Sequence, residues 1–161
     1  MRQRVLKLGI PDVSLQVMDL NQSCFSEEIF DFLLLDVPCS GLGTLASNPD
    51  IKWRFRQKEL CRLQDYQLGL LRSVFPLLKR GRELIYSTCS TEEEENEEVV
   101  SFLLEKYDNA KIQEIVLKIK RSKPITEFNN KKYHKDVDKC LRIWPQDNDT
   151  EGFFVARIKK S

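Results

Sequence analysis

The sequence predicts an α/β fold, because short apolar runs alternate along it with segments of helical periodicity. The run from Phe32 to Leu35 is unbroken, which is typical of a strand buried on both faces. Between positions 58 and 78 leucines recur at helical spacing, and Gly81 follows as a helix stop. A chain of 161 residues is the size of one ordinary domain, so we expect residues 1 to 161 to form a single domain.

The elements around this central helix follow in chain order. Val13 to Val17 predicts a short strand that ends beside Asp19. Leu84 to Tyr86 predicts the strand after the helix, which completes a βαβ unit. A helix is predicted next over about 92 to 107, where Thr91 and Glu94 can form a capping box.

The last third of the chain is less regular. Alternating residues 112 to 116 predict an edge strand, and the polar, basic stretch 118 to 140 predicts a long surface excursion. The segments 141 to 144 and 153 to 158 predict two strands separated by a turn-rich stretch. We therefore expect a mostly parallel sheet that ends in an antiparallel hairpin.

Composition restricts the functional class. The chain has 41% hydrophobic and 32% charged residues, a balance that fits a globular cytoplasmic protein. We find no apolar run long enough to cross a membrane and no signal-peptide layout. The net charge of +1 offers no general attraction for nucleic acid, so an RNA surface would need local clusters of Lys and Arg.

Two of the five cysteines stand out by position. The set has no C-x-x-C pair, so we expect reduced thiols, with Cys24, Cys61 and Cys140 as inert core residues. Cys39 lies in D-V-P-C-S-G (36 to 41) and Cys89 in S-T-C-S (87 to 90), each directly after a predicted strand. If these strands are neighbours in a parallel sheet, both thiols face one crevice at its carboxyl edge.

These motifs resemble the RsmB/Sun group of ribosomal RNA cytosine-5 methyltransferases. D-V-P-C-S-G-L-G-T-L at 36 to 45 resembles motif IV of that family, and Y-S-T-C-S at 86 to 90 resembles motif VI. The stretches 48 to 54, 91 to 100 and 151 to 156 continue the match in the expected order. The resemblance implies a Rossmann-like class I methyltransferase sheet, S-adenosylmethionine as cofactor, and RNA, in particular 16S ribosomal RNA, as substrate.

The resemblance also implies a role for each residue. Carbon 5 of cytosine becomes nucleophilic only after a thiolate adds to carbon 6, and a second group must then help release the base. Cys89 would be the nucleophile and Cys39 would assist release of the methylated base. Asp36 would lie between the cofactor's methionine end and the target base, and Asp19 would bind the cofactor's adenine amino group.

The ionisation of Cys89 has two opposing influences in the sequence. The N-terminus of the following helix should lower the pKa of this thiol, whereas Glu92 to Glu95 should raise it. We interpret the acidic run as a solvated first helical turn and expect no metal site, because successive helical carboxylates point in different directions.

One segment mixes cations with aromatic rings, as RNA-binding surfaces do. It contains Lys52, Trp53, Arg54 and Arg56 around Phe55, and the alternative is an amphipathic helix entry with Trp53 in the core. Basic residues within 118 to 139 can add a rim to this surface or form a solvated loop. His134 lies in that loop, and we interpret it as incidental to catalysis.

The N-terminal region departs from the family pattern. The six glycines do not form the glycine-rich strand-turn-helix that cradles the cofactor, so we expect the second half of a catalytic domain, with the missing half supplied in the same chain or in trans. Two other classes stay open. One is a noncatalytic RNA-binding or assembly module. The other is a DNA cytosine-5 methyltransferase, in which the Pro-Cys cysteine is the nucleophile.

Overall fold

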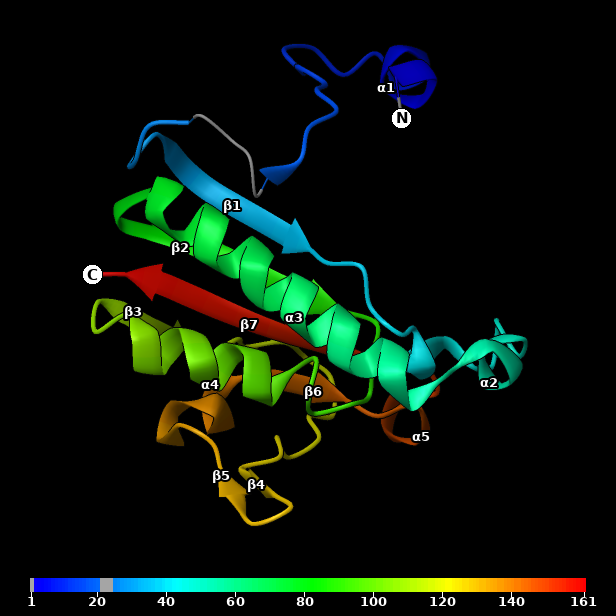
Figure 1. The fold of residues 1–161 in the computed structure, drawn as a ribbon. Coiled ribbons are helices and arrows are strands. Elements are labelled where there is room, and N and C mark those ends of the chain that lie inside the picture. Colours follow the sequence, from blue (N-terminus) through cyan, green and yellow to red (C-terminus); the bar gives the residue numbers. More distant parts are fainter. Residues whose placement is uncertain (1, 21–24) are drawn as a thin grey trace.

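The computed structural model describes residues 2–20 and 25–161 (Figure 1). Four segments form two neighbouring parallel strands and the two long helices: β1 (Phe30–Asp36), α3 (Gln57–Val74), β2 (Leu78–Thr88) and α4 (Glu97–Lys106). The other strands are β3 (Ala110–Gln113), β4 (Glu127–Phe128), β5 (Lys131–Lys132), β6 (Leu141–Ile143) and β7 (Phe153–Lys160). The short helices are α1 (Arg2–Leu8), η2 (Leu42–Thr44), α2 (Ile51–Arg54), η3 (Phe75–Leu77), η4 (Lys135–Lys139) and α5 (Pro145–Asn148).

A five-stranded sheet carries the described structure, with the strand order β1-β2-β7-β3. β1 and β2 are parallel, whereas β7 is antiparallel to β2, β3 and β6. Four of its strands therefore run in one direction and only β7 runs against them. The predicted α/β sheet, with mostly parallel strands and a terminal antiparallel pair formed by β6 and β7, is confirmed.

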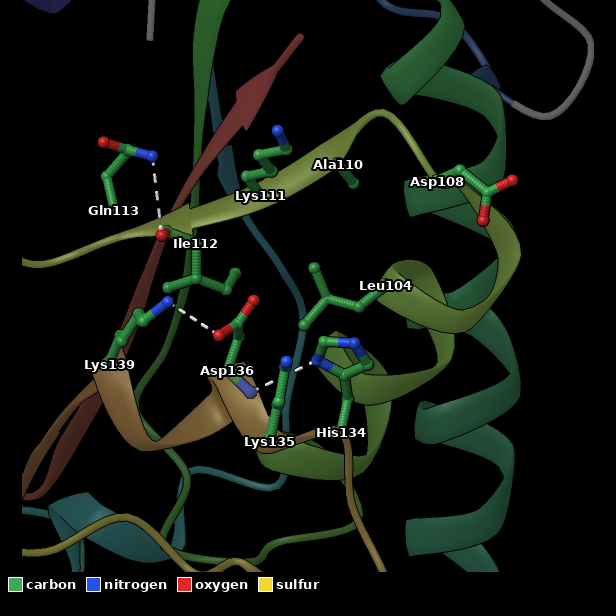
Figure 2. A pocket seen from close by; sticks show the side chains of 10 residues that line it. All are labelled: Leu104, Asp108, Ala110, Lys111, Ile112, Gln113, His134, Lys135, Asp136 and Lys139. Carbon is green, nitrogen blue, oxygen red and sulfur yellow. Dashed lines mark hydrogen bonds and ion pairs between the residues drawn. The ribbon is translucent and has the colours of Figure 1, made fainter.

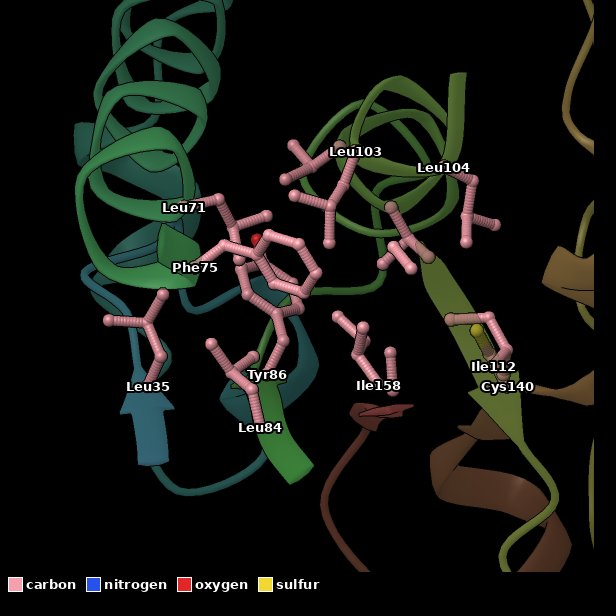
Figure 3. Packing of buried hydrophobic residues seen from close by; sticks show 14 of the residues in the cluster. Leu35, Leu71, Phe75, Leu84, Tyr86, Leu103, Leu104, Ile112, Cys140 and Ile158 are labelled. Atoms are coloured by element: carbon pink, nitrogen blue, oxygen red, sulfur yellow. The ribbon is translucent and has the colours of Figure 1, made fainter. Parts of the chain in front are cut away.

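The core lies between this sheet and two helices. In Figure 1, α3 and α4 lie side by side on the same face of the sheet. Figure 3 shows Leu71 of α3, Phe75 of η3, Leu103 of α4, and Tyr86 and Ile158 of the sheet packed into one cluster. All five are at most 1% exposed. Burial of these apolar side chains is the main force that fixes the crossover helix on the sheet.

β1 is an edge strand with one covered and one open face. Leu35 is 8% exposed and faces the helices, whereas Phe32 and Leu34 are 56% and 67% exposed. The expectation that the run 32 to 35 is buried on both faces is therefore wrong for its outer face in the described chain. No described strand pairs with the outer edge of β1.

Three local predictions differ from the structure. Residues 13 to 17 form no strand, because they pair with no neighbour, and Val17 is fully exposed. Gly81 does not end a helix: the helix α3 ends at Val74, and Gly81 lies within β2 at a φ of 76°, where the register with β1 shifts. The helix predicted from 92 begins only at Glu97, after a turn, so the Thr91 and Glu94 capping box does not form.

The stretch 118 to 140 has only short regular elements, as predicted, but it does not lie wholly on the surface, because Tyr133, Val137 and Cys140 are buried in the core. It contains the two-residue strands β4 and β5 and the short helix η4, and Ser122 bridges to Arg142 beside the main sheet. The predicted edge strand near 112 is present as β3. Across residues 2–20 and 25–161, no helix combines the length and apolar character of a membrane span.

Candidate active site

The two cysteines of the predicted motifs lie in contact. β1 ends at Asp36 and β2 at Thr88, and because these strands are parallel neighbours, the loops after them leave the same edge of the sheet. The Sγ atoms of Cys39 and Cys89 are 3.2 Å apart, although 50 positions separate the residues in sequence. Both side chains are half-buried. The prediction that the two thiols meet at one edge of the sheet is confirmed.

The two thiols differ in acidity because they form one hydrogen-bonded pair. The hydrogen bond from Cys39 lowers the pKa of Cys89 to about 7, although partial burial and the carboxylates of Asp36 and Glu95 oppose the shift. The same contact, with burial, raises the pKa of Cys39 well above its ordinary range. When the pair loses a proton near neutral pH, the thiolate is therefore favoured at Cys89, and Cys39 stays protonated.

The low pKa of Cys89 does not come from the helix N-terminus, which is the cause that the sequence suggests. Seven residues separate Cys89 from Glu97, the first residue of α4, and the intervening residues form a turn. A helix dipole acts mainly within the first turn of its helix. The thiol partner, rather than the helix N-terminus, is the main cause of the low pKa at Cys89.

Asp36 joins the two motifs at the ends of their strands. It pairs with Ser87 in the sheet register, and its Oδ1 accepts a hydrogen bond of 2.8 Å from the Ser87 hydroxyl. The Asp36 side chain is exposed at the sheet edge. Its carboxylate is thereby oriented beside the thiol pair and accessible to a ligand.

Gly43 fixes the backbone at Cys89 and tolerates no side chain. Its N–H donates to the Cys89 carbonyl at 2.9 Å, and its own carbonyl accepts from the Gly152 N–H at 2.8 Å. A Cβ on Gly43 would lie 2.4 Å from the Gly152 carbonyl oxygen and 2.7 Å from that of Cys89. These backbone atoms cannot move aside cheaply, so the loop after β1, the loop after β2 and the start of β7 form one rigid unit.

The acidic run after Cys89 is largely enclosed, contrary to the prediction of a solvated helical turn. Glu93 and Glu95 are 7% and 0% exposed. Burial, and then repulsion from Glu94, raises the pKa of Glu92. The oxygens of Glu92, Glu93 and Glu94 lie within 4.8 Å of one another, and that they bind no metal stays a prediction. Nothing in the sequence distinguished Glu95 from its neighbours.

The predicted RNA-binding residues form an exposed patch beside the cysteines. Trp53 of α2 is 72% exposed, so its alternative placement in the core is wrong, and the Lys52 Nζ lies 5.1 Å from its ring centroid. Lys52, Arg54 and Arg56 are exposed as well. A cavity of about 290 Å³ connects this patch to the site, with Arg54 and Cys39 both in its lining.

The remaining predicted residues lie elsewhere. Asp19 is exposed in the segment before β1 and does not follow a strand. His134 lines a separate cavity of about 350 Å³ with Leu104, Lys111 and Asp136 (Figure 2). Its Nδ1 accepts a hydrogen bond from the Asp136 N–H at the start of η4, which is a structural role.

The other cysteines are in different environments. Cys140 is fully buried, as predicted, and burial raises the pKa of its thiol. Cys61 is exposed on α3, so its predicted burial is wrong. Cys24 lies outside the described residues.

Comparison with known proteins places this geometry in a family. Residues 1–159 match the family described as 16S rRNA methyltransferase RsmB/F. The chain is 42% identical over 134 residues to the tRNA (cytosine(49)-C(5))-methyltransferase of Pyrococcus abyssi, covering 83% of this chain and 43% of that protein. It is 36% identical over 165 residues to ribosomal RNA small subunit methyltransferase F of Shewanella piezotolerans, covering 97% of this chain and 31% of that protein.

A solved structure agrees with these sequence matches. The structure of NSun6 from Pyrococcus horikoshii with SFG superposes with a TM-score of 0.81 at 30% identity, over 99% of this chain and 38% of that chain. The chain thus spans less than half the length of each of these relatives. The family match, the fold and the paired cysteines agree, and the chain belongs to the 16S rRNA methyltransferase RsmB/F family.

Proposed function

We propose that this chain is the C-terminal portion of the catalytic domain of an RNA cytosine-5 methyltransferase that uses S-adenosylmethionine. The observation that carries the proposal is the contact between Cys39 and Cys89, with the thiolate favoured at Cys89. Cytosine-5 methylation needs an ionised nucleophile and a second group that assists the later elimination. A hydrogen-bonded thiolate and thiol provide both at one place.

The proposed reaction begins at Cys89. Its thiolate adds to carbon 6 of cytosine and forms a C–S bond, which makes carbon 5 nucleophilic. The cofactor, when bound, supplies the methyl group that carbon 5 takes up. A base then takes the carbon 5 proton and passes it to solvent, and the electrons of that C–H bond re-form the double bond between carbons 5 and 6. The C–S bond breaks, and its electron pair returns to Cys89 as the thiolate. Cys39 assists this release from 3.2 Å away.

Asp36 is the residue of this chain whose carboxylate can contact both the cofactor and the target base. Ser87 occupies its Oδ1, and no hydrogen bond from the described residues is recorded at Oδ2. That oxygen can accept a bond from an amino group, such as that of cytosine or that of the cofactor's methionine end. For Asp19 we keep the proposal that it binds the adenine amino group, on the strength of the family resemblance alone.

The substrate we propose is ribosomal RNA of the small subunit, and the proposed location is the cytoplasm. The family description and the Shewanella relative support this choice. Lys52, Trp53, Arg54 and Arg56 supply the cationic and aromatic groups that bind exposed nucleotides, next to a cavity that reaches Cys39. The reaction as proposed uses no metal.

A further partner is proposed at the edge of β1. Phe32 and Leu34 are largely exposed there, whereas parallel sheets are normally covered on both faces, and an exposed edge strand is a template for pairing. The chain covers only 43% of the Pyrococcus relative and 31% of the Shewanella relative. We propose that the other half of the catalytic domain, in the same polypeptide or in trans, pairs with this edge and completes the cofactor site.

Substitution of the two cysteines tests the proposal. In the complete enzyme, Cys89→Ala should abolish methylation of 16S RNA. Cys39→Ala should still permit attack and methyl transfer but stall the elimination, so that enzyme and RNA accumulate as a covalent complex that survives denaturing electrophoresis. The double variant should form no complex, and a transfer RNA substrate serves as the specificity control.

The opposite results identify the other functions. If Cys89→Ala traps the complex and Cys39→Ala does not, Cys39 is the nucleophile, as in DNA cytosine-5 methyltransferases. If RNA binds equally with and without S-adenosylmethionine, and loss of either cysteine changes nothing, the chain is a noncatalytic RNA-binding or assembly module.

A further inference from the structure

Glu95 is a fully buried carboxylate in direct contact with the loop that carries Cys39. Its Oε1 accepts hydrogen bonds of 2.9 Å from the Ser40 backbone N–H and of 2.9 Å from the Gln67 side-chain amide. Its Oε2 accepts a bond of 2.6 Å from the Ser40 hydroxyl. The Glu95 side chain is 0% exposed. A buried carboxylate is costly unless donors surround it, so this arrangement needs all of its bonds.

No cation compensates this charge in the described part of the chain. The ion pairs found there do not include Glu95, whereas Glu97, equally buried, pairs with Arg142 at 2.5 Å. Stabilisation of Glu95 therefore comes from neutral donors, and most of these belong to Ser40. Movement of the Cys39 loop would leave the buried Glu95 carboxylate without these donors, which is costly. The carboxylate therefore favours the loop position in which Ser40 donates to it.

A chain of hydroxyl groups extends this contact to Cys89. The Ser40 hydroxyl donates its proton to Glu95, so its contact of 3.0 Å with the Ser90 hydroxyl must use the Ser90 proton. Ser40 directly follows Cys39, and Ser90 directly follows Cys89. The bonds thus run from Ser90 to Ser40 to Glu95, and they join the residues next to both thiols.

The backbone of Glu95 is held in turn by the sheet. Its carbonyl accepts a bond of 2.6 Å from the hydroxyl of Tyr86, which is fully buried in β2. Gln67 of α3 also donates to the carbonyl of Pro38, just before Cys39, at 2.9 Å. Glu95 therefore links the rigid core to the cysteine loops rather than following their movement.

We infer that Glu95 is a positioning residue that holds the thiols of Cys39 and Cys89 in contact by accepting the hydrogen bonds of the Ser40 and Ser90 chain. A carboxylate suits this task because both of its oxygens only accept. In Glu95→Gln, which keeps the volume, the new NH₂ group cannot accept a proton from Ser40. Either the Ser40 backbone N–H loses its acceptor, or the Ser40 hydroxyl must turn to accept from the amide, which reverses its bond with Ser90. The inference rests on the proposed function in one respect: it takes the pair of Cys39 and Cys89 to be catalytic.

The experiment measures how close Cys39 stays to Cys89 without using RNA. The purified protein is treated with oxidised glutathione, quenched in acid and mapped by mass spectrometry. The Cys89 thiolate attacks one glutathione sulfur and releases one glutathione thiolate. The Cys39 thiolate then attacks the Cys89 sulfur of the mixed disulfide and releases the second. Two protein thiols are oxidised and one glutathione disulfide is reduced.

The readout is the ratio of Cys39–Cys89 disulfide to Cys89–glutathione disulfide, which reports the effective concentration of one thiol at the other. We expect the internal disulfide to dominate in the unaltered protein. Glu95→Gln should lower the ratio by about tenfold or more, since small displacements of reacting groups carry large kinetic costs. Ser40→Ala, which keeps the backbone bond to Glu95, should lower it less. Labelling of exposed Cys61 provides the internal reference.

Glu97→Gln is the matched control, because it places the same amide at an equally buried carboxylate outside the cysteine loops. It should lower the melting temperature and leave the ratio unchanged. An unchanged ratio in Glu95→Gln, or an equal fall in Glu97→Gln, would overturn the inference. If Glu95→Gln does not fold, Ser40→Ala decides, and an unchanged ratio there contradicts the hydroxyl chain.

A second readout separates this inference from the proposed function. In the complete enzyme with RNA, Glu95→Gln should accumulate the covalent complex as Cys39→Ala does, because attack at Cys89 continues while release is impaired. If no variant, Cys39→Ala included, forms a complex or transfers methyl, the proposed function fails. The disulfide ratio then still judges the role of Glu95 by itself.

Discussion

The thiols of Cys39 and Cys89 ionise at different pH values because one stabilises the charge of the other. A thiol that donates to a thiolate loses its own tendency to ionise, whereas the thiolate gains stability. Partial burial and the negative charges of Asp36 and Glu95 oppose ionisation of Cys89, so loss of the hydrogen bond from Cys39, the largest lowering influence, would raise the pKa of Cys89. Their contact thus distinguishes the thiol that we propose as nucleophile from the thiol that we propose to assist release.

Alkylation of Cys89 by iodoacetamide tests this at single-residue resolution. Only the thiolate reacts, so the rate should rise with pH and reach half its maximum near pH 7, where the pKa of Cys89 lies. In Cys39→Ala the donor is gone, the pKa rises, and the midpoint should move to higher pH. Peptide mapping separates Cys89 from Cys61. A midpoint that stays at the same pH in Cys39→Ala would show that another group lowers the pKa.

The sequence alone predicts that the two cysteines meet, but it does not explain the pKa of Cys89 or identify Glu95. Two cysteines after neighbouring strand ends must share an edge, so their meeting followed from topology alone. The cause of the low pKa did not follow, because it depends on the 3.2 Å between two sulfurs. Glu95 could not be identified either, since a run of four glutamates gives no sign of which side chain turns inward.

Among the elements, the strands and helices of the core follow hydrophobic periodicity closely, and the segments at the ends do not. α3 was predicted from its leucine spacing, and β6 and β7 from two apolar runs around a turn. The start of α4 was predicted too early because the capping pattern at Thr91 is outweighed by bonds that hold a turn: Asn96 binds Thr88 and Ser90. Tertiary contacts there override a local signal.

The helix α2 provides the element-scale prediction. Trp53 packs against no core residue and lies beside Lys52, so Trp53→Ala should leave the melting temperature unchanged. It should weaken binding of single-stranded RNA by about 1–3 kcal/mol if one base stacks on the ring. Fluorescence anisotropy with a labelled RNA measures this, and Tyr66→Ala, at another exposed aromatic on α3, is the matched control. Equal affinities for both variants would remove α2 from the RNA surface.

On the scale of the whole molecule, the sheet has a covered face, an open face and an unpaired edge at β1. A strand at 13 to 17 would have to pair at that edge, because a strand forms only where a neighbour satisfies its backbone N–H and C=O groups. The hydrophobic periodicity of a segment does not show which strand it pairs with. This is why the sheet order could be inferred near α3 and not before β1.

The same reasoning predicts weak cofactor binding by the 161-residue polypeptide on its own. In the proposed site Asp36 would contact the cofactor from one side, and the described residues contain no glycine-rich turn that could cradle the rest of it. We expect a Kd for S-adenosylmethionine weaker than about 1 mM, or less than about 4 kcal/mol of binding free energy. Isothermal titration calorimetry measures this. Tight, stoichiometric binding would place the cofactor site elsewhere in this chain.

The central claim, that Cys89 attacks the base and Cys39 releases it, is tested most directly by locating the covalent bond. Cys39→Ala in the complete enzyme is incubated with RNA and S-adenosylmethionine, digested with protease and nuclease, and analysed by tandem mass spectrometry. We predict a methylated cytidine adduct on the peptide that contains Cys89. An adduct on any other cysteine of this variant, or methylated RNA released at the unaltered rate without any adduct, would contradict the assignment.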